Sequence, residues 1–533
     1  MLKPIAGVVE GDSVPVWALV VSVTVVVLVA LTIQDLIQTR HAIRRVFPLV
    51  GRLRYLLEKV GPELRQYIVT SDLEERPFNR AQRSWVYQTA KGVNSAVGFG
   101  TQRDVSKDGE FHFLPALFPT LEEEAPVDAE PHVIGRRRPR PFVLHSRVNI
   151  APMSFGALSA AAIRALAVGA AEAGIYLNTG EGGLSPYHLS GGGDVVFQIG
   201  PAKYGVRGLD GHIDWGRLTE IGAHQQVRAI EIKLGQGAKP GKGGILPGVK
   251  VTKEIAGIRG IEPGKASHSP NRFKEFSTIP ELIEFVERVK GCVPVPVGVK
   301  VVVGDPAFLD ELARERAATG RGPDYISVDG AEGGTGAAPM SLADHVGLGL
   351  HDALAAVDDA YRRHGVRDEV SVIAAGRIIT GADAAYAIAL GADLVNIGRG
   401  FLFSIGCIQA LRCHTNECPA GVATQSQWRQ RGLVPTQKGQ RVANYARAVR
   451  EDLMVMTRAV GLTSPAQLTR EMVEVVTDVA GRTRLSTLYP YPPEAMRSAV
   501  DRGAFAVTSE GAPDGAGASE GAPDGAGAVV RAG

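Results

Sequence analysis

The chain has 533 residues, of which 45% are hydrophobic and 6% aromatic, and it contains 64 glycines. This composition is typical of an α/β protein rich in tight turns, with one large domain or several smaller ones. The 58 basic and 56 acidic residues give a net charge of +2, which argues against a nucleic-acid-binding protein. Four cysteines in so long a chain exclude a disulfide framework and indicate a reducing compartment.

Residues 14–33 (VPVWALVVSVTVVVLVALTI) form a run of twenty residues without a charged side chain. This length is enough for one helix to cross a bilayer. Glu10 and Asp12 precede the run, whereas a signal peptide begins with basic residues. The many valines would also suit a buried pair of strands, but no turn residue interrupts the run. We therefore predict a short segment 1–13 followed by a transmembrane helix at 14–33.

Basic residues are concentrated after this run. Only Lys3 precedes it, whereas five arginines follow within about twenty residues. The positive-inside rule then predicts a single-pass membrane protein whose N-terminus lies outside and whose main domain is cytoplasmic. Residues 52–67 (RLRYLLEKVGPELRQY) look amphipathic, which suits either a helix on the membrane surface or an ordinary domain helix.

Residues 34–145 are predicted to be a juxtamembrane and N-terminal extension. From residue 71 onward they are polar and punctuated by prolines, which indicates an irregular region packed on the main domain. The run Arg136-Arg137-Arg138 is interpreted as a solvated loop rather than as a lipid or nucleic-acid site.

Short β-rich runs alternate with helical stretches between residues 146 and 430. The candidate strands are 148–152, 175–178, 195–199, 229–233, 297–301, 325–329, 372–375 and 394–397. Eight such units, each followed by glycine-rich or polar residues, predict an α/β fold of the (β/α)8 TIM barrel class. A doubly wound sheet is the competing architecture, but no GxGxxG motif follows the first strand.

Three of the four cysteines, Cys407, Cys413 and Cys418, lie in residues 398–425 (GRGFLFSIGCIQALRCHTNECPAGVATQ). Three soft thiolate ligands so close together are typical of a metal or iron–sulfur site. Structural zinc usually uses C-x2-4-C pairs and four ligands, which this spacing does not match well. Three buried, reduced cysteines are the remaining interpretation.

The last part of the chain changes in composition. Residues 431–505 begin with a helical pattern (VANYARAVREDLMVMTRAVG) and are predicted to be a helical C-terminal extension packed on the barrel. The decapeptide SEGAPDGAGA then occurs twice in succession. Such a composition cannot bury a core, so residues 506–533 are predicted to be a disordered tail.

Barrel enzymes place their reacting groups at the C-terminal ends of the strands. Here strands 7 and 8 end in Gly376-Arg377 and Gly398-Arg399, where glycine amides and an arginine suit a phosphate group. Strand 5 presents Lys300, and small residues follow strand 1. Together these features predict a site for flavin mononucleotide (FMN).

Several longer motifs carry a resemblance to a known family. PMSFGALS (152–159), NTGEGG (178–183), QGAKPGKGG (236–244), EGGTGAAP (332–339) and the cysteine motif CxxxxxCHTNxCPxGVATQ occur in the order found in the flavin domain of glutamate synthase. The similarity extends over about residues 145–430. With its apolar N-terminal run, the chain most resembles the stand-alone FMN-binding glutamate synthase family proteins, which lack the glutaminase domain.

The resemblance implies FMN and a three-iron, four-sulfur (3Fe-4S) cluster as cofactors, with Cys407, Cys413 and Cys418 as the cluster ligands. It implies that 2-oxoglutarate and ammonia form 2-iminoglutarate, which reduced flavin converts to glutamate. No amidotransferase domain is expected in this chain, so ammonia would be free or delivered by a partner. The electron partner would be ferredoxin or a reductase subunit.

The resemblance also implies roles for individual residues. Glu181 and Lys239 match the catalytic acid and lysine of the substrate site, and Arg259 matches an arginine that pairs with a substrate carboxylate. Lys300 would lie near flavin N1, where a fixed cation stabilises the reduced ring. The other predicted flavin contacts are Met153, Ser154, Gln198, Gly333, Gly334, Gly376, Arg377, Gly398 and Arg399.

One position departs from the family pattern in a way that affects the substrate. Isoleucine occupies position 245, where glutamate synthases carry a glutamine that contacts the substrate. Three functions therefore stay open. They are glutamate synthesis by reductive amination, oxidation of an amino or hydroxy acid with electrons passed to a membrane acceptor, and an anchored flavoprotein without catalytic activity.

Overall fold

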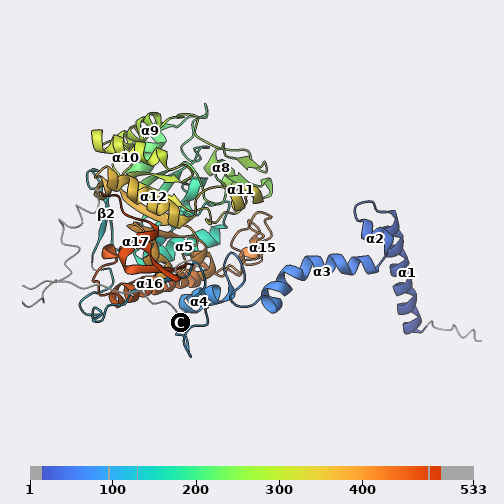
Figure 1. The fold of residues 1–533 in the computed structure, drawn as a ribbon. Coiled ribbons are helices and arrows are strands. Elements are labelled where there is room, and N and C mark those ends of the chain that lie inside the picture. The colour runs from blue at the N-terminus through green and yellow to red at the C-terminus, as the bar shows by residue number, and fades with distance from the viewer. Residues whose placement is uncertain (1–14, 94–95, 129, 478–480, 494–533) are drawn as a thin grey trace, which may run out of the picture.

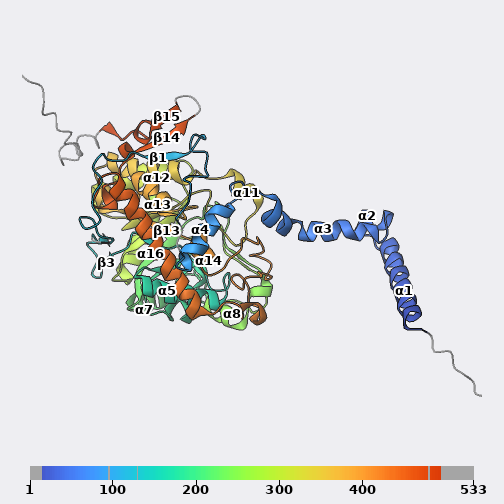
Figure 2. The same ribbon diagram turned by 90° about the horizontal axis from the view of Figure 1, so that it is seen from below.

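The structure is a computed structural model that describes residues 15–93, 96–128, 130–477 and 481–493. The predicted segment 1–13 and the predicted tail 506–533 lie outside the described residues. Figure 1 shows a large globular body and, beside it, an arm formed by the first three helices. Figure 2 shows the same two parts from below, with the arm again pointing away from the body.

Eight parallel strands close a barrel in which each strand pairs with the next along the chain and the last pairs with the first. The strands are β4 (Val148–Ile150), β5 (Leu177–Asn178), β6 (Val195–Ile199), β7 (Val227–Lys233), β10 (Val297–Val301), β11 (Tyr325–Asp329), β12 (Ser371–Ala375) and β13 (Leu394–Ile397). All eight predicted strands are present, so the predicted (β/α)8 barrel is confirmed. The valine- and isoleucine-rich runs suit strands that are covered on both faces.

Helices surround the barrel and cover the outer faces of its strands. The longer ones are α5 (Ala160–Ala173), α7 (Trp215–Ala223), α9 (Ile279–Cys292), α10 (Ala307–Thr319), α12 (Leu350–Arg363) and α13 (Gly381–Ala389). The shorter elements are α6 (Pro186–Leu189), α8 (Lys253–Arg259), α11 (Met340–His345), α14 (Arg399–Ser404), α15 (Gln427–Gln430), α17 (Leu485–Leu488), β8 (Ile245–Leu246) and β9 (Ser267–His268). Side-chain caps mark several starts; for example, Ser159 Oγ accepts a hydrogen bond from the Ala162 amide at 3.1 Å.

The barrel interior is apolar at its N-terminal end and polar toward the other end. Tyr176, Tyr325 and other inward residues cluster with the hairpin of β2 (His132–Ile134) and β3 (Phe142–Leu144), which closes that end. A Cβ on Gly298 would lie 2.5 Å from the Tyr325 ring, so glycine leaves space for the tyrosine. Buried polar side chains occupy the inward positions farther along the strands: Asn178, Gln198, Glu231, Ser327 and Asn396.

The N-terminal arm consists of α1 (Val16–Ile37), α2 (Ala42–Val46) and α3 (Val50–Leu64), followed by one π-helical turn, Arg65–Val69. Helix α1 is long and apolar enough to cross a membrane, and none of its apolar window is buried inside the molecule. The region predicted to be irregular contains an unpredicted helix, α4 (Arg80–Ala90). Its start at Asn79 is a capping box with Gln82, a local signal that sequence inspection had missed.

The C-terminal extension begins with a long helix, α16 (Pro435–Ala459), that crosses α5. A Cβ on Gly169 would lie 2.4 Å from the Gly439 carbonyl oxygen, so the two helices approach through glycine. Beyond α16, the described part of this extension contains strands as well as the short helix α17. Strands β14 (Val473–Thr477) and β15 (Gly481–Arg484) form an antiparallel sheet with β1 (Phe111–Phe113).

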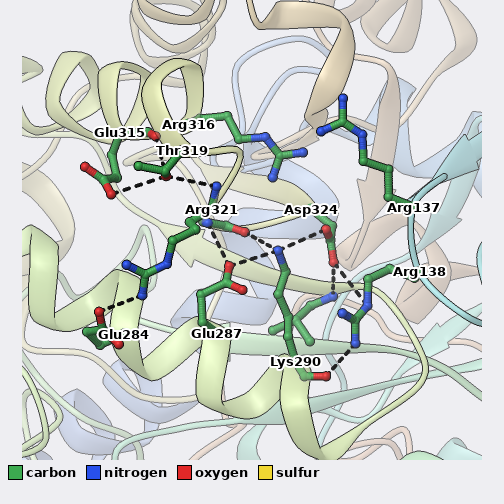
Figure 3. Close-up of polar contacts among 12 residues, drawn as sticks. Arg137, Arg138, Glu284, Glu287, Lys290, Glu315, Arg316, Thr319, Arg321 and Asp324 are labelled. Carbon is green, nitrogen blue, oxygen red and sulfur yellow. Dashed lines mark hydrogen bonds and ion pairs between the residues drawn. The ribbon is translucent and has the colours of Figure 1, made fainter.

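The N-terminal extension is fixed to the closed end of the barrel by Arg138. The Arg138 Nη2 atom donates to the Lys290 carbonyl oxygen at 2.7 Å, and Lys290 Nζ lies 3.3 Å from Asp324 Oδ1 (Figure 3). The Arg138 side chain is only 15% exposed. The interpretation of the arginine run as a solvated loop is therefore wrong for Arg138. Its guanidinium group donates hydrogen bonds to backbone carbonyl oxygens at the end of α9 and before β10.

A buried carboxylate joins the C-terminal extension to the barrel helices. Asp358, on α12, accepts hydrogen bonds from Arg362 at 2.6 Å, Arg367 at 2.8 Å and Arg470 at 3.0 Å. Neither Asp358 nor Arg470 has any exposed side-chain surface. Removal of the carboxylate would leave buried guanidinium groups without their counter-charge.

We expect Asp358→Ala to lower the free energy of unfolding by roughly 3–5 kcal/mol, because a buried ion pair loses one partner. Urea unfolding of the full chain in detergent, followed by fluorescence, measures this loss. The matched control is Asp310→Ala, which removes the surface carboxylate that pairs with Arg363 at 2.9 Å. This change should cost about 0–1 kcal/mol. Equal losses in the two variants would contradict a structural role for the buried network.

Candidate active site

A cavity of about 470 Å³ opens at the C-terminal ends of the barrel strands and reaches the cysteine segment 398–425. All of the site residues predicted from sequence line this one cavity: Met153, Ser154, Glu181, Gln198, Lys239, Arg259, Lys300, Gly333, Gly334, Gly376, Arg377, Gly398, Arg399, Cys407, Cys413 and Cys418. The fold therefore brings them to one place, while their individual roles stay predictions.

Glu181 lies in the turn after β5, and the loops around it leave space for its carboxylate alone. A Cβ on Gly200 or Gly244 would lie 2.3 Å or 2.2 Å from the carboxylate oxygens. The Oε1 atom accepts a hydrogen bond from Lys233 Nζ at 2.8 Å. The Oε2 atom is buried and has no hydrogen-bond partner among residues that the structure describes. One oxygen is thus fixed, and the other is available to a ligand.

Three cations surround this carboxylate. Burial opposes ionisation of Glu181, but Lys233, Lys239 and Arg259 outweigh it and lower the pKa of the carboxyl group. Burial, with the nearby charge of Lys233, lowers the pKa of Lys239 to about 8. The Lys239 Nζ atom donates to the Ala337 carbonyl oxygen at 3.0 Å. The site therefore carries more positive than negative charge, which suits an anionic ligand.

Arg259 is held in place by contacts on two sides. Its Nη2 atom donates to the Phe155 carbonyl oxygen at 3.0 Å, and its guanidinium carbon lies 5.1 Å from the centroid of the Tyr204 ring. The Nε atom is buried without a hydrogen-bond partner in the described part of the chain. A guanidinium that is stacked on a ring and keeps a free donor is well suited to a carboxylate.

Lys300 on β10 and Gln198 on β6 extend into the barrel interior, and each contacts a carboxylate. The Lys300 Nζ atom lies 3.0 Å from Asp329 Oδ2, which also accepts from the Gly237 amide at 2.9 Å. The Gln198 Nε2 atom donates to Glu231 Oε1 at 2.7 Å. These contacts fix the orientation of both side chains at the floor of the cavity.

The loops after β12 and β13 place two arginines on one side of the cavity. Gly376 and Arg377 have positive φ angles of 152° and 53°. Burial lowers the pKa of Arg399 to about 10, and the guanidinium lies 4.7 Å from the centroid of the Phe78 ring. A Cβ on Gly334 would lie 3.0 Å from Arg399, so close packing requires a small residue there. This arrangement can hold a phosphate group.

The cysteine segment is attached to the loop after β4 and to the N-terminal extension. The Lys250 Nζ atom donates to the carbonyl oxygens of Ala157 at 2.9 Å and Cys413 at 2.7 Å. The Tyr87 hydroxyl donates to the Cys407 carbonyl oxygen at 2.7 Å. Asn416 adopts a positive φ of 65°, and its side chain accepts from the Gln425 amide at 2.7 Å. The contact made by Asn416 gives this polar residue between Cys413 and Cys418 a structural role.

The three thiols lie close enough to influence one another. Burial, together with the nearby thiols of Cys413 and Cys418, raises the pKa of Cys407 to about 12. Burial also raises the pKa of Cys413. In the described ranges, no group of three or more His, Cys, Asp or Glu side chains is arranged to hold a metal ion.

Sequence inspection missed several residues that complete the site. Lys233 pairs with Glu181, Asp329 pairs with Lys300, and Glu231 holds Gln198. Asn396 lines the cavity with an Nδ2 atom that is buried and has no hydrogen-bond partner within the described ranges. Glu231 and Lys233 are two positions apart on β7 and therefore point to the same side of the strand. Charged residues with this spacing in an otherwise apolar strand were the available signal.

The chain matches known proteins over most of its length. The family model described as "Conserved region in glutamate synthase" matches residues 111–463. The glutamate synthase large subunit-like protein YerD of Bacillus subtilis is 40% identical over 492 residues, which cover 85% of this chain and 93% of that protein. The archaeal glutamate synthase (NADPH) of Methanocaldococcus jannaschii is 38% identical over 325 residues, or 60% of each protein.

Among solved structures, a mandelate oxidase with (S)-4-hydroxymandelic acid aligns with 75% of this chain and 98% of its own, at 17% identity and a TM-score of 0.43. That likeness is too distant to bear on function. The family match, by contrast, includes all the barrel strands and the cysteine segment. The chain belongs to the glutamate synthase family of oxidoreductases.

Proposed function

We propose that residues 146–430 bind FMN and reduce 2-iminoglutarate, formed from 2-oxoglutarate and ammonia, to glutamate. The observation that carries this proposal is the group of Glu181, Lys233, Lys239 and Arg259 in the same cavity as Lys300 and the two glycine–arginine loops. Both parts of the cavity carry positive charge. A dicarboxylate substrate would supply negative charge beside Glu181, Lys239 and Arg259, and the cofactor phosphate would supply it at the glycine–arginine loops.

The residues at the cavity fit FMN. The phosphate group would contact Arg377, Arg399 and the backbone at Gly376 and Gly398, where side chains leave space. Lys300 would face the flavin ring, whose reduced form carries negative charge that a fixed ammonium stabilises. Met153, Ser154 and Gln198 would contact the ring, and Gly333 and Gly334 would let the backbone approach it. Bound FMN would supply the hydride that reduces the imine.

The substrate would be oriented by charge. Arg259 and Lys239 would each hold a carboxylate, which fixes the imine carbon relative to the flavin. Glu181 would be ionised, because its neighbours lower its pKa. Its free Oε2 atom would accept an N–H of the protonated imine and stabilise the cation that receives the hydride. Enclosure of the cavity would limit hydrolysis of the imine by water.

The cysteine segment is suited to an iron–sulfur cluster of the 3Fe-4S kind. In such a cluster each thiolate binds a different iron, so Cys407, Cys413 and Cys418 need not converge on one point as ligands of a single metal ion do. The buried ammonium of Lys250, 1% exposed, lies beside this segment and would offset the negative charge of the thiolates. The cluster would pass electrons between FMN and ferredoxin, a reductase subunit or another carrier.

Helix α1 would anchor this enzyme as a single-pass membrane protein, with the barrel on the cytoplasmic side where the arginines lie. A second candidate function is a membrane-linked FMN dehydrogenase that oxidises an amino or hydroxy acid. Ile245 lines the cavity in place of the family's glutamine, which favours a substrate other than 2-oxoglutarate. A flavoprotein without catalytic activity would not need the charged group around Glu181.

The proposed reaction is tested by flavin oxidation. Purified protein is photoreduced without oxygen and mixed with 2-oxoglutarate and ammonia, and flavin absorbance is followed. Rapid reoxidation with formation of glutamate is expected. Glu181→Gln should slow this step at least about 100-fold without loss of bound flavin, because the protonated imine loses its counter-charge. Glu284→Gln, on an exposed pair with Arg321, is the control and should leave the rate unchanged.

If 2-oxoglutarate and ammonia do not reoxidise the reduced flavin, the synthase reaction is contradicted. Reduction of the oxidised flavin by an amino or hydroxy acid in the same apparatus would instead establish the dehydrogenase. If the flavin reacts with no substrate in either direction, the alternative of a flavoprotein without catalytic activity is favoured.

The pH dependence tests the role of Lys239. Because its ammonium loses the proton near pH 8, kcat/KM for 2-oxoglutarate should fall as the pH rises through about 8 when free ammonia is held constant. Lys239→Arg keeps its charge to higher pH and should abolish this fall. Lys242→Arg, at an exposed position of the same loop, is the control. A rate that increases through pH 8 would make neutral Lys239 a base instead.

The cluster ligands are tested by their iron content. Cys413→Ser should lose bound iron and the broad visible absorbance of the cluster, while FMN stays bound, because the flavin contacts lie on other loops. Iron analysis and the visible spectrum measure both. Cys292→Ser, on α9, is the matched control and should keep its iron. Unchanged iron in Cys413→Ser would refute the assignment.

A further inference from the structure

Helix α3 carries an apolar face that neither hydrophobic core covers in the part of the chain that the structure describes. Six apolar residues at helical spacing make up this face, and all are exposed: Val50, Leu53, Leu56, Leu57, Val60 and Leu64. Ile68 and Val69 in the following turn are each 75% exposed. A stable soluble protein rarely leaves so large an apolar surface in water, so this face is covered by something.

Residues 50–69, which make up α3 and the following turn, carry a net positive charge. They contain four basic residues (Arg52, Arg54, Lys59 and Arg65) and two glutamates, and Arg40 and Arg45 precede them. Arg54 lies at one edge of the apolar face of α3, and Arg65 begins the turn that follows the helix. An amphipathic helix with this charge attracts an anionic lipid surface, where its apolar face enters the boundary between headgroups and acyl chains.

The direction of α3 is fixed relative to α1 by a buried carboxylate. Asp35, near the end of α1, has no exposed surface. It accepts hydrogen bonds from Arg44 Nη2 at 2.6 Å, Arg52 Nε at 2.7 Å and the Leu49 amide at 3.1 Å. A Cβ on Gly51 would lie 2.9 Å from the Arg44 Cα atom, so α2 and α3 meet closely. These contacts fix the angle between α1 and α3, so the turn that joins them is not a free hinge.

Figure 1 and Figure 2 both show α3 running across the direction of α1 and leading back to the barrel. The far end of α3 is also held. Gln66 Nε2 donates to the Ile408 carbonyl oxygen at 2.9 Å, and Glu63 lies 3.1 Å from Arg412. If α1 crosses the bilayer, α3 therefore lies parallel to the membrane surface and close to the cysteine segment.

We propose that α3, with the turn at 65–69, is an in-plane membrane helix whose apolar face is covered by an anionic lipid leaflet. This inference rests on the proposed membrane span of α1 and adds a second, independent membrane contact. Lipid is the partner expected to cover the apolar face of α3, because this helix follows the anchoring helix, has basic residues beside the face and is aligned by the Asp35 contacts.

Tryptophan substitutions in the full chain test the proposal. Leu57→Trp places the probe on the apolar face, and Glu58→Trp, the matched control, places it on the polar side, about 100° around the helix from Leu57. Each protein is reconstituted into vesicles of phosphatidylcholine and phosphatidylglycerol, and the emission of the unsubstituted chain is subtracted. Bromine-labelled lipid should quench Leu57→Trp several-fold more than Glu58→Trp, whereas aqueous acrylamide should quench Glu58→Trp more.

Equal acrylamide quenching of both probes would overturn the proposal. Shielding of Leu57→Trp from acrylamide without quenching by bromine-labelled lipid would also overturn it, because the face would then be covered by protein. Carbonate extraction of the unsubstituted chain separates this result from failure of the anchor. Release into the soluble fraction would refute the span of α1, whereas retention with a water-exposed Leu57→Trp would refute only the in-plane helix.

Discussion

The ion pair between Glu181 and Lys233 is the interaction on which the mouth of the barrel depends. A buried pair of charges is costly to form unless its surroundings are shaped for it. Here Gly200 and Gly244 leave space for the carboxylate, and Lys239 and Arg259 add positive charge around it. The loops after several strands are thus organised around one acid, and the surplus of positive charge defines the kind of ligand that completes the site.

The barrel could be predicted because each strand is a short β-branched run between a helical stretch and a glycine-rich loop. This local pattern is present in the sequence of each βα unit, so each strand can be predicted separately. The extensions were harder, because their structure comes from distant contacts. The arginine run predicts a solvated loop, yet Arg138 is largely covered and donates to carbonyls of α9 and of the segment before β10. The sheet that joins β1 to β14 links residues more than 300 positions apart, which no local pattern can reveal.

The site shows the same division. Glu181 and Lys239 were predicted from the resemblance of their glycine-rich motifs to glutamate synthase, and the fold brings both of them to the cavity. Lys233 was missed although its spacing from Glu231 in an apolar strand was a signal. Asn396 was missed because its inward position becomes evident only when the neighbouring strands are in place. For the cysteines, their proximity in the sequence indicated a metal or iron–sulfur site, and the resemblance implied the ligand set. The cysteine segment is also held by contacts from Lys250 and Tyr87, which come from other parts of the chain.

The attachment of α3 at both ends has a mechanical consequence. A flexible linker limits only the distance between two domains. A helix that is fixed at Asp35 and at Gln66 also fixes the rotation of the barrel relative to α1. Loss of one residue from α3 would shorten the spacer by only about 1.5 Å but would turn the barrel by roughly 100° about the helix axis. If α1 spans a membrane as proposed, the rotational phase of α3, more than its length, decides which side of the barrel faces the bilayer.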